Sequence, residues 1–559
     1  MMRLSFKDWT KSGSPWIWLN AGAVAISVIL VLGLIGIIAI RGLAHFWPAD
    51  LQQSMATDLQ GQKRMMLGEV VQKEQVTAEQ LRGAGHQVDV EDDFLERQLF
   101  KVGNRDLYGF DFRWVLSRDL ENVEYPEHAV AVERREWGNF YGYLLEIKEH
   151  GETIGTQPLG ENLLWEEAKE RIDRAVDIYW QIHSLEKQDI GAINYELEQL
   201  RLEERRLELE GQDTPENLAQ IEEERQHWDQ EYQALLQRLS KLNEDFSRDS
   251  FVMRTTDGQQ IEIGLDNIVR AFQPNSMNVL EKLGHYAAKV WEFVSEDPRE
   301  ANTEGGIFPA IFGTVLMVLI MSVIVTPFGV MAAVYLREYA KQGFLTRTIR
   351  IAVNNLAGVP SIVYGVFGLG FFVYFVGGSL DEIFYPEALP APTFGTPGLM
   401  WASLTLALLT LPVVIVATEE GLSRIPRSVR EGSLALGATK AETLWRVVLP
   451  MASPAMMTGV ILAVARAAGE VAPLMLVGVV KLAPNLPLDG NAPFLHLDRQ
   501  FMHLGFHIYD VGFQSPNVEA ARPLVYATAL MLVAVIAALN LTAIAIRNRL
   551  REKYRALDM

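Results

Sequence analysis

Cysteine is absent from all 559 residues, which excludes disulfides, thiolate metal sites and cysteine nucleophiles. Basic residues are also scarce: 50 Lys and Arg stand against 70 Asp and Glu, giving a formal net charge of -20. Because nucleic-acid backbones are bound through clustered cations, this balance excludes a nucleic-acid partner. No G-x-x-x-x-G-K-[ST] phosphate loop occurs, so the chain has no recognisable site for ATP hydrolysis and we predict no catalytic residues.

Charge is missing locally as well, in long apolar runs. Residues 17–40 hold no ionisable side chain, and at about 1.5 Å per residue a helix of this length crosses a hydrocarbon core of about 30 Å. The run exceeds the apolar stretch of a signal peptide, so we interpret it as a retained first span. Five more spans are predicted at 307–336, 351–376, 399–418, 455–480 and 523–546.

The positions of the basic side chains indicate the orientation of these six spans, because Lys and Arg accumulate in short cytoplasmic segments. In a six-span chain four basic segments share one side: the N-terminus (Arg3, Lys7, Lys11), the loops after spans two and four, and the tail from Arg547 to Arg555. We therefore expect a multi-pass membrane protein with both termini in the cytoplasm. The long segment between spans one and two would then lie outside, which is the periplasm in a Gram-negative cell.

That segment, 43–306, has the composition of a soluble domain. Apolar and polar residues alternate over 110–116, 129–132 and 140–147, and a further strand pair flanks the Asp257-Gly258 turn. Between these strands, at about 161–248, apolar residues repeat in heptads from Ile172 to Leu207 and again from Leu218 to Phe246. Thr214 and Pro215 are suited to begin the second helix. We predict an α+β domain carrying an antiparallel coiled-coil hairpin.

His183 and Glu186 interrupt the first heptad seam, and we interpret them as polar residues that fix its register. The other candidate ligands are His227, His496, His503 and His507, whose spacing matches no zinc signature. We assign no metal site.

The loop after span four carries the most specific pattern. Glu431-Gly432-Ser433 is followed after three residues by Gly437, and after nine more by Val447-Val448-Leu449-Pro450. A short helix up to Gly437, a turn there, and a second helix over 438–449 stopped before Pro450 would form a rigid helix-turn-helix. The spacing resembles the EAA loop of ABC import permeases, with Gly-Ser in place of Ala-Ala. The resemblance implies that Glu431, Gly432, Ser433, Gly437, Ala438, Thr439, Leu449 and Pro450 couple the chain to an ATPase.

Three stretches narrow the resemblance to PstA-type phosphate permeases: 356–365 in span three, 425–428 with 434–440 in the loop, and 465–474 in span five. The similarity covers about 308–549 and leaves out the hairpin. It implies as partners a second homologous permease subunit, a cytoplasmic ATPase dimer and a periplasmic phosphate-binding protein. The chain itself would bind no cofactor, since ATP and Mg²⁺ would be used by the ATPase.

Arg466 and Glu470 are ionisable residues within predicted span five. An ionised side chain in the hydrocarbon region costs about 2.5–3.5 kcal/mol, so it normally lines a cavity or pairs internally. Being four residues apart on one helix, the two can form an ion pair. A closed packing pair is one reading; the other is that Arg466 faces the pathway and offers its guanidinium to phosphate. Many relatives carry an arginine where this chain has Val416, so a second cation would have to come from the partner permease.

The predicted architecture is therefore an all-α polytopic membrane protein of six transmembrane helices with the ABC importer permease fold and an inserted α+β periplasmic domain. Its parts are 1–42 (N-terminus and first span), 43–306 (periplasmic domain), 307–546 (permease core, with the coupling loop at about 419–452) and 547–559 (basic tail). The expected function is phosphate import. A permease for sulfate, molybdate or phosphonate, and a membrane phosphate-sensing or scaffold protein, stay open as alternatives.

Overall fold

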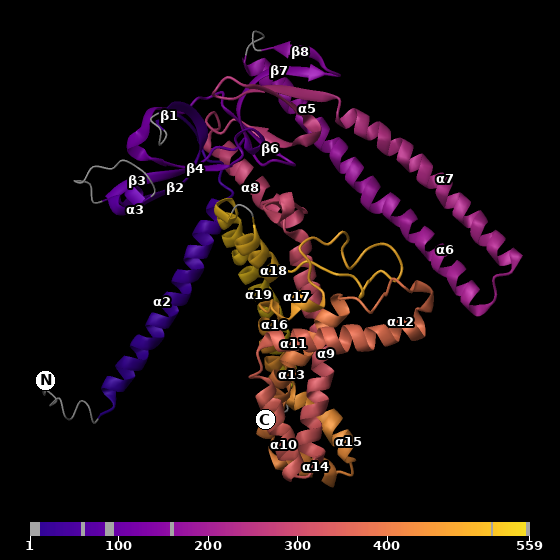
Figure 1. Ribbon diagram of the computed structural model, residues 1–559. Coiled ribbons are helices and arrows are strands. Elements are labelled where there is room, and N and C mark those ends of the chain that lie inside the picture. Colours follow the sequence, from indigo (N-terminus) through magenta and orange to yellow (C-terminus); the bar gives the residue numbers. More distant parts are fainter. Residues whose placement is uncertain (1–11, 58–61, 84–93, 157–160, 516–517, 555–559) are drawn as a thin grey trace.

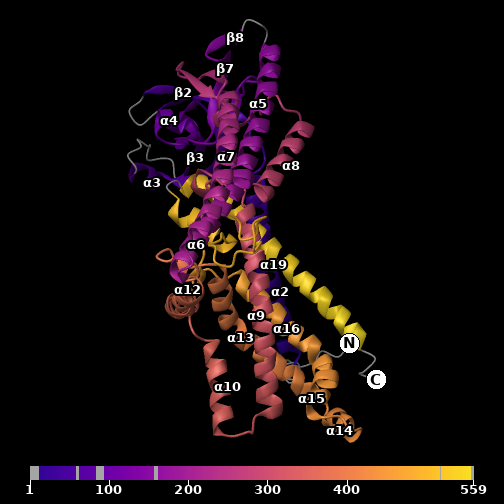
Figure 2. The ribbon, with the colours of Figure 1, turned by 90° about the vertical axis from the view of Figure 1, so that its right-hand side faces the viewer.

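The computed structural model describes residues 12–57, 62–83, 94–156, 161–515 and 518–554. The basic residues Arg3, Lys7, Lys11 and Arg555 lie outside these ranges. Two views show an elongated molecule with all the strands at one end (Figures 1 and 2). Toward the opposite end lie the first turn of α2 (Ser14–Ala44), the last turn of α19 (Val518–Tyr554), and α10 (Phe344–Leu356), α14 (Arg427–Ala435) and α15 (Lys440–Thr443).

Among the described residues, six helices are long and apolar enough to cross a membrane, which confirms the predicted number of spans. They run over Pro15–Ala44 in α2, Phe308–Tyr339, Ser361–Phe384, Leu399–Arg424, Lys440–Ala468, and Ala521–Glu552 in α19. The second to fifth spans contain α9 (Phe308–Val334), α11 (Ser361–Phe367) with α12 (Gly378–Phe384), α13 (Leu399–Arg424), and α15 with α16 (Leu449–Ala468).

All six spans differ from their predicted bounds at one or both ends, and in two of them proline and glycine cause a large shift. The third begins at Ser361 rather than 351, since Gly358 and Pro360 separate it from the amphipathic helix α10. The fifth ends at Ala468 rather than 480, because Gly469 and Pro473 follow and the chain continues into the short α17 (Leu474–Val477).

The fifth span also corrects the expectation that Pro450 ends the second helix of the loop. The helix continues through Pro450, and a π-helical segment, Leu444–Val448, directly precedes it. A proline ring clashes with the carbonyl four residues earlier, and the wider π-helical turn relieves that clash without breaking the helix.

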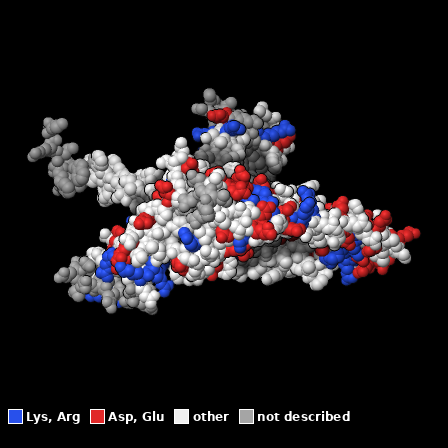
Figure 3. All heavy atoms as spheres, turned by 90° about the horizontal axis from the view of Figure 1, so that it is seen from above, with Lys and Arg blue, Asp and Glu red and all other residues white. Residues whose placement is uncertain are grey.

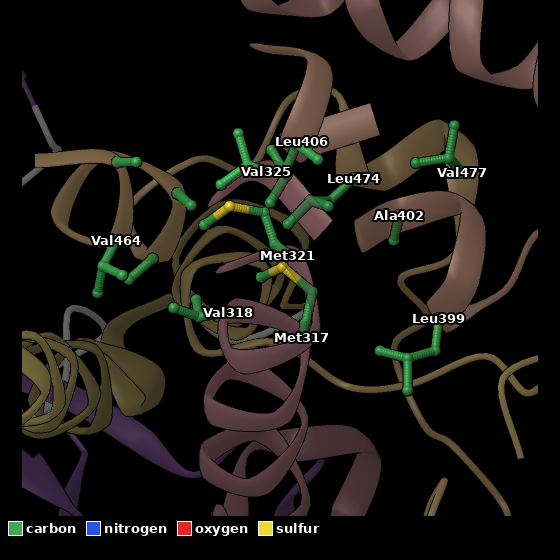
Figure 4. Close-up of a cluster of buried hydrophobic side chains, with 14 of the residues drawn as sticks. Met317, Val318, Met321, Val325, Leu399, Ala402, Leu406, Val464, Leu474 and Val477 are labelled. Carbon is green, nitrogen blue, oxygen red and sulfur yellow. The ribbon is translucent and has the colours of Figure 1, made fainter. Parts of the chain in front are cut away.

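The centre of the membrane part is a buried apolar cluster shared by α9, α13, α16 and α17. Met317, Met321 and Val325 of α9 face Leu406 of α13 and Val464 of α16 (Figure 4). Glycine lets the helices approach closely: a Cβ on Gly459 of α16 would lie 2.7 Å from the Cβ of Ala417. By contrast, α2 contacts α19, but the apolar surface of α2 is exposed. In Figure 3, α2 is the white part of the arm at the left.

Within the described residues, the inserted part between α2 and α9 contains two large antiparallel sheets and a small two-stranded one. One has the strand order β4-β3-β2-β1-β5, and the other the order β10-β9-β7-β6-β11 with β8 paired to β7. This confirms the predicted strands at 110–116, 129–132, 140–147 and both sides of Asp257-Gly258. The strands are β1 (Leu51–Thr57), β2 (Lys63–Thr77), β3 (Phe94–Lys101), β4 (Phe112–Leu116), β5 (Leu120–Glu124), β6 (Val130–Arg134), β7 (Phe140–Glu149), β8 (Glu152–Thr156), β9 (Asp249–Arg254), β10 (Gln260–Gly264) and β11 (Ile268–Phe272).

Shorter elements complete this part and link it to the membrane helices. They are α3 (Ala78–Gly83), α4 (Arg105–Tyr108), α8 (Val279–Ser295), β12 (Pro298–Arg299) and β13 (Glu304–Gly305). Helix α8 precedes α9 and begins with a reciprocal cap between Asn278 and Glu281.

A helical hairpin extends from the second sheet. Its first arm comprises α5 (Glu161–Ser184), a π-helical segment (Leu185–Ile190) and α6 (Gly191–Glu210), and its second arm is α7 (Pro215–Phe246). The arms run side by side in opposite directions (Figure 1). As predicted, the Thr214 hydroxyl accepts a hydrogen bond from the Asn217 N–H at 3.3 Å, with Pro215 in the first turn.

Glu186 does not lie in the seam between the arms, which corrects its predicted register role. Its side chain is exposed, while Leu185 and Ile190 are buried. The π-helical turn holds more residues than an α-helical one, so it moves Glu186 out of the heptad phase. His183 is half-buried and stacks on Tyr179 with ring centroids 5.9 Å apart.

Candidate coupling loop and anion pathway

The loop after α13 forms a helix-turn-helix. α14 ends in a turn at Gly437, where φ is +90°, a left-handed conformation that glycine adopts without the penalty a Cβ would bring. The N–H of Gly437 donates to the carbonyl of Leu434 at 3.0 Å, and that of Ala438 donates to Ser433 at 3.3 Å. These bonds satisfy carbonyls at the end of α14, so the turn is defined by backbone geometry.

The second helix begins with a reciprocal cap. The Glu442 N–H donates to the Thr439 hydroxyl at 3.2 Å, and the Thr439 N–H donates to the Glu442 carboxylate at 2.9 Å. The hydroxyls of Ser433 and Thr443 lie 2.9 Å apart and join the two helices. Sequence analysis missed the role of Glu442, although the T-x-x-E spacing from Thr439 is the local signal for such a cap.

Side chains fasten this helix-turn-helix to the π-helical segment Tyr335–Tyr339, which follows α9 and ends the second span. The Arg430 guanidinium lies 2.9 Å from the Glu338 carboxylate and donates to the carbonyls of Ile425 at 2.7 Å and Leu422 at 2.8 Å. The Lys440 ammonium donates to the backbone carbonyl of Glu338. Motion of α14 and α15 is therefore connected directly to the second span.

The outer surface of the loop is apolar and exposed. The exposed fractions are 91% for Leu436, 73% for Trp445 and 47% for Leu434. Of the predicted coupling residues, Glu431, Gly432, Gly437 and Thr439 are exposed, whereas Ser433, Ala438, Leu449 and Pro450 are partly buried. The loop thus brings the eight predicted residues into one segment, in which the partly buried members support an exposed face.

Arg466 and Glu470 form the expected ion pair, with Nε of Arg466 3.5 Å from Oε1 of Glu470. Glu470 lies beyond the last residue of α16, however, and not on the same helix as predicted, because α16 ends before Gly469. Both side chains stay partly accessible, at 34% and 20%. The guanidinium therefore keeps surface on which a further acceptor could bind.

At the other predicted position, Val416 is partly buried in α13. The nearby Glu419 pairs with Arg350 of α10, with 3.1 Å between guanidinium and carboxylate.

Within the described ranges, no three His, Cys, Asp or Glu side chains gather in a geometry that could hold a metal. His496 shares a hydrogen bond of 2.8 Å with Asp489, and His503 accepts one from the Gly505 N–H at 3.1 Å. Burial lowers the pKa of His503 to about 4, so this ring is neutral at physiological pH. His227 is exposed and lies 3.9 Å from Glu231.

Comparison with known proteins places this architecture. Residues 325–556 match the family described as binding-protein-dependent transport system inner membrane component. Phosphate transport system permease protein PstA 1 of Mycobacterium tuberculosis (strain CDC 1551 / Oshkosh) is 36% identical over 247 residues, covering 44% of this chain and 71% of that protein. The chain belongs to the PstA-type permease family. PstA of Mycobacterium leprae (strain TN) is 34% identical over 276 residues, covering 48% of this chain and 81% of that protein.

This PstA-type chain is a multi-pass membrane component of a transport system rather than an enzyme. The family match begins inside α9 and ends beyond the described part of α19. It includes the helix-turn-helix, Arg466 and Glu470. The two sheets and the hairpin lie outside it.

Proposed function

We propose that the chain is the permease subunit of an ATP-driven importer that carries inorganic phosphate across the bacterial inner membrane. The observation that carries this proposal is the exposed helix-turn-helix over 427–443, which is fastened to the end of the second span and lies within the family match. The relatives named as phosphate transport permeases support phosphate as the transported ion. Because the chain has no phosphate loop for ATP hydrolysis, the energy for transport comes from another subunit in this proposal.

The proposed motor is a cytoplasmic ATPase dimer that docks on Leu436 and its neighbours and uses ATP with Mg²⁺. An exposed apolar surface on an ordered element favours a protein partner. In this arrangement 419–452 is the coupling loop, 1–42 and 547–559 bring both termini to the cytoplasm, and 43–306 is periplasmic. In Figures 1 and 2 the start of α2 and the end of α19 lie toward the same end of the molecule as the loop, which supports this orientation, as does the basic composition of these segments.

Two further partners complete the proposed complex: a second homologous permease subunit and a periplasmic phosphate-binding protein. The exposed apolar surfaces of α2 and α19 support a neighbour in the membrane, either lipid or the second permease. The proposed packing of the hairpin is that of an antiparallel coiled coil. The heptad pattern supports such packing between α6 and α7, where Arg225 pairs with Glu204 across the arms.

Within the core, we assign Arg466 to the anion pathway, with Glu470 orienting it. Arg466 is the favoured contact because a guanidinium offers a planar pair of donors to phosphate oxygens and retains accessible surface. In this proposal Val416 leaves the second cationic contact to the partner permease.

The proposal is tested by reconstituting the chain with its proposed partners in liposomes. ATP-dependent uptake of labelled phosphate, inhibited by unlabelled phosphate more strongly than by sulfate, molybdate or phosphonate, is the expected result. Uptake independent of ATP, or preferred competition by another oxyanion, would contradict it. In the same system, Gly437→Pro is expected to abolish recovery of the untagged ATPase with the chain, whereas wild type retains it.

A further inference from the structure

The first arm of the hairpin touches the membrane part far from the sheets. The Lys187 ammonium donates to the backbone carbonyl of Pro484 at 2.6 Å, and the Tyr195 hydroxyl donates to that of Ala492. The Tyr195 ring also meets the His496 ring edge-on, with centroids 6.4 Å apart. Figure 1 shows the first arm, α5 followed by α6, running from the sheets to the level of α12. The contacted segment, 481–501, joins α17 to α18 (Leu504–Tyr509) and is called the outer loop below.

The outer loop is braced internally by side chains. The Asp489 carboxylate accepts a hydrogen bond from Arg499 at 2.5 Å and lies 2.8 Å from Nε2 of His496. Arg499 also donates to the carbonyl of Leu486 at 2.8 Å. Because these bonds connect its parts, a displacement of one part of the outer loop also displaces the rest.

The outer loop is also hydrogen-bonded to the start of the fourth span. The N–H of Met400 donates to the carbonyl of Leu497 at 2.8 Å, and that of Leu399 donates to Arg499 at 2.9 Å. On the other side, Val480 donates to Phe501 at 3.1 Å. The position of the outer loop thus bears on both the first turn of α13 and the chain that follows Glu470.

At its base the hairpin is held to the second sheet. Asp249 is fully buried and pairs with Arg171 and Arg174 of α5, each at 3.0 Å. The Arg135 guanidinium lies 3.4 Å from the centroid of the Tyr179 ring. An arm fixed at its base and bonded near its middle acts as a strut between the sheets and the outer loop.

The net charge of the hairpin favours a structural role over a role in guiding phosphate toward the membrane part. Over 161–248, 23 acidic residues stand against 11 basic ones, and Figure 3 shows acidic side chains gathered toward the outer end of the hairpin. A negative surface of this kind repels an anion.

We propose that Lys187 and Tyr195 are positioning residues for transport: they hold the outer loop in place, so that the inserted domain sets the geometry at the start of α13. This inference rests on the proposed transport function for its activity readout. Its structural half, the contact between α6 and the outer loop, is independent of the cargo.

The contact is tested by cross-linking in the complete complex. Because the chain has no cysteine, Tyr195→Cys with Ala492→Cys introduces its only two thiols. A short bismaleimide is expected to join them at least tenfold more than in the control pair of Lys169→Cys with Ala492→Cys, since Lys169 lies about 39 Å from Tyr195 along the helix. Equal cross-linking of the two pairs, or none in either, would overturn the proposal.

The positioning role is tested by uptake in liposomes. Tyr195→Phe and Lys187→Met are each expected to slow ATP-dependent phosphate uptake about threefold to tenfold, the range that loss of one hydrogen bond corresponds to. Lys187→Arg should restore the rate, because it keeps the donor. Lys241→Met, on an exposed position of α7, should transport like wild type.

The outcomes separate the two proposals. Wild-type rates in Tyr195→Phe and Lys187→Met, or failure of Lys187→Arg to restore uptake, would overturn the positioning role. Absence of ATP-dependent uptake in wild type would instead remove the proposed function, and the cross-linking result would still decide the contact.

Discussion

Leu436 offers the sharpest test of the coupling loop, because its side chain is 91% exposed and its backbone is unstrained at φ -79°. Replacing it with alanine therefore leaves the fold of the chain almost unchanged. If the ATPase buries this side chain, the interface loses about 1.5–3 kcal/mol of apolar burial. At about 1.4 kcal/mol for each factor of ten, the dissociation constant rises between about tenfold and 150-fold.

The measurement is a titration of the purified ATPase against the detergent-solubilised chain, wild type and Leu436→Ala side by side. Leu209→Ala is the matched control, since this leucine is 50% exposed and lies at the hairpin end of α6. We expect the control to bind like wild type and both variants to unfold at the wild-type temperature. A dissociation constant within twofold of wild type for Leu436→Ala would refute the assignment of this face to the motor.

Three further predictions concern the pathway, the loop anchor and the inserted domain. Arg466→Ala is expected to abolish phosphate uptake and Arg466→Lys to reduce it, and undiminished uptake by both assembled variants would remove Arg466 from the pathway. Arg430→Ala removes the pair with Glu338 and two hydrogen bonds to carbonyls, so it should destabilise the chain by about 2 kcal/mol, seen as a lower unfolding temperature, whereas an unchanged temperature would speak against the anchor. Burial alone would raise the pKa of Asp249, but the hydrogen bond from Arg248 and the neighbouring arginines outweigh it and lower this pKa. The carboxylate therefore stabilises the fold above about pH 4 and loses this effect as the pH falls further. Asp249→Asn should make the unfolding temperature, measured by tryptophan fluorescence, fall less steeply toward acid pH than in wild type. The same slope in both proteins would contradict this prediction.

The sequence predicts most of the fold because its signals are local. An uncharged run locates α2, alternation locates β7, and Thr214-Pro215 locates the start of α7. The misjudged bounds are also local in origin: Pro360 separates α10 from the third span, and a π-helical turn carries the fifth span through Pro450. An apolar window registers hydrophobicity but not these changes in backbone geometry.

The site could be predicted in part for the same reason. The spacing around Gly437 identifies the turn, since a left-handed residue is a requirement of one position. The tie from Arg430 to Glu338 joins residues 92 positions apart, and no periodicity connects them. The contact of Tyr195 with Ala492 spans 297 positions. Such partners follow from the tertiary arrangement, which a single sequence does not state.

The central claim is that the exposed face around Leu436 lies on the cytoplasmic side, within reach of a motor. In a chain without cysteine, Leu436→Cys and Leu209→Cys each provide a single thiol. The direct measurement treats intact spheroplasts with a membrane-impermeant maleimide and then repeats the labelling after lysis. Leu209→Cys should react in intact spheroplasts and Leu436→Cys only after lysis. Reaction of Leu436→Cys before lysis would contradict the account, because an outward-facing loop cannot bind a cytoplasmic ATPase.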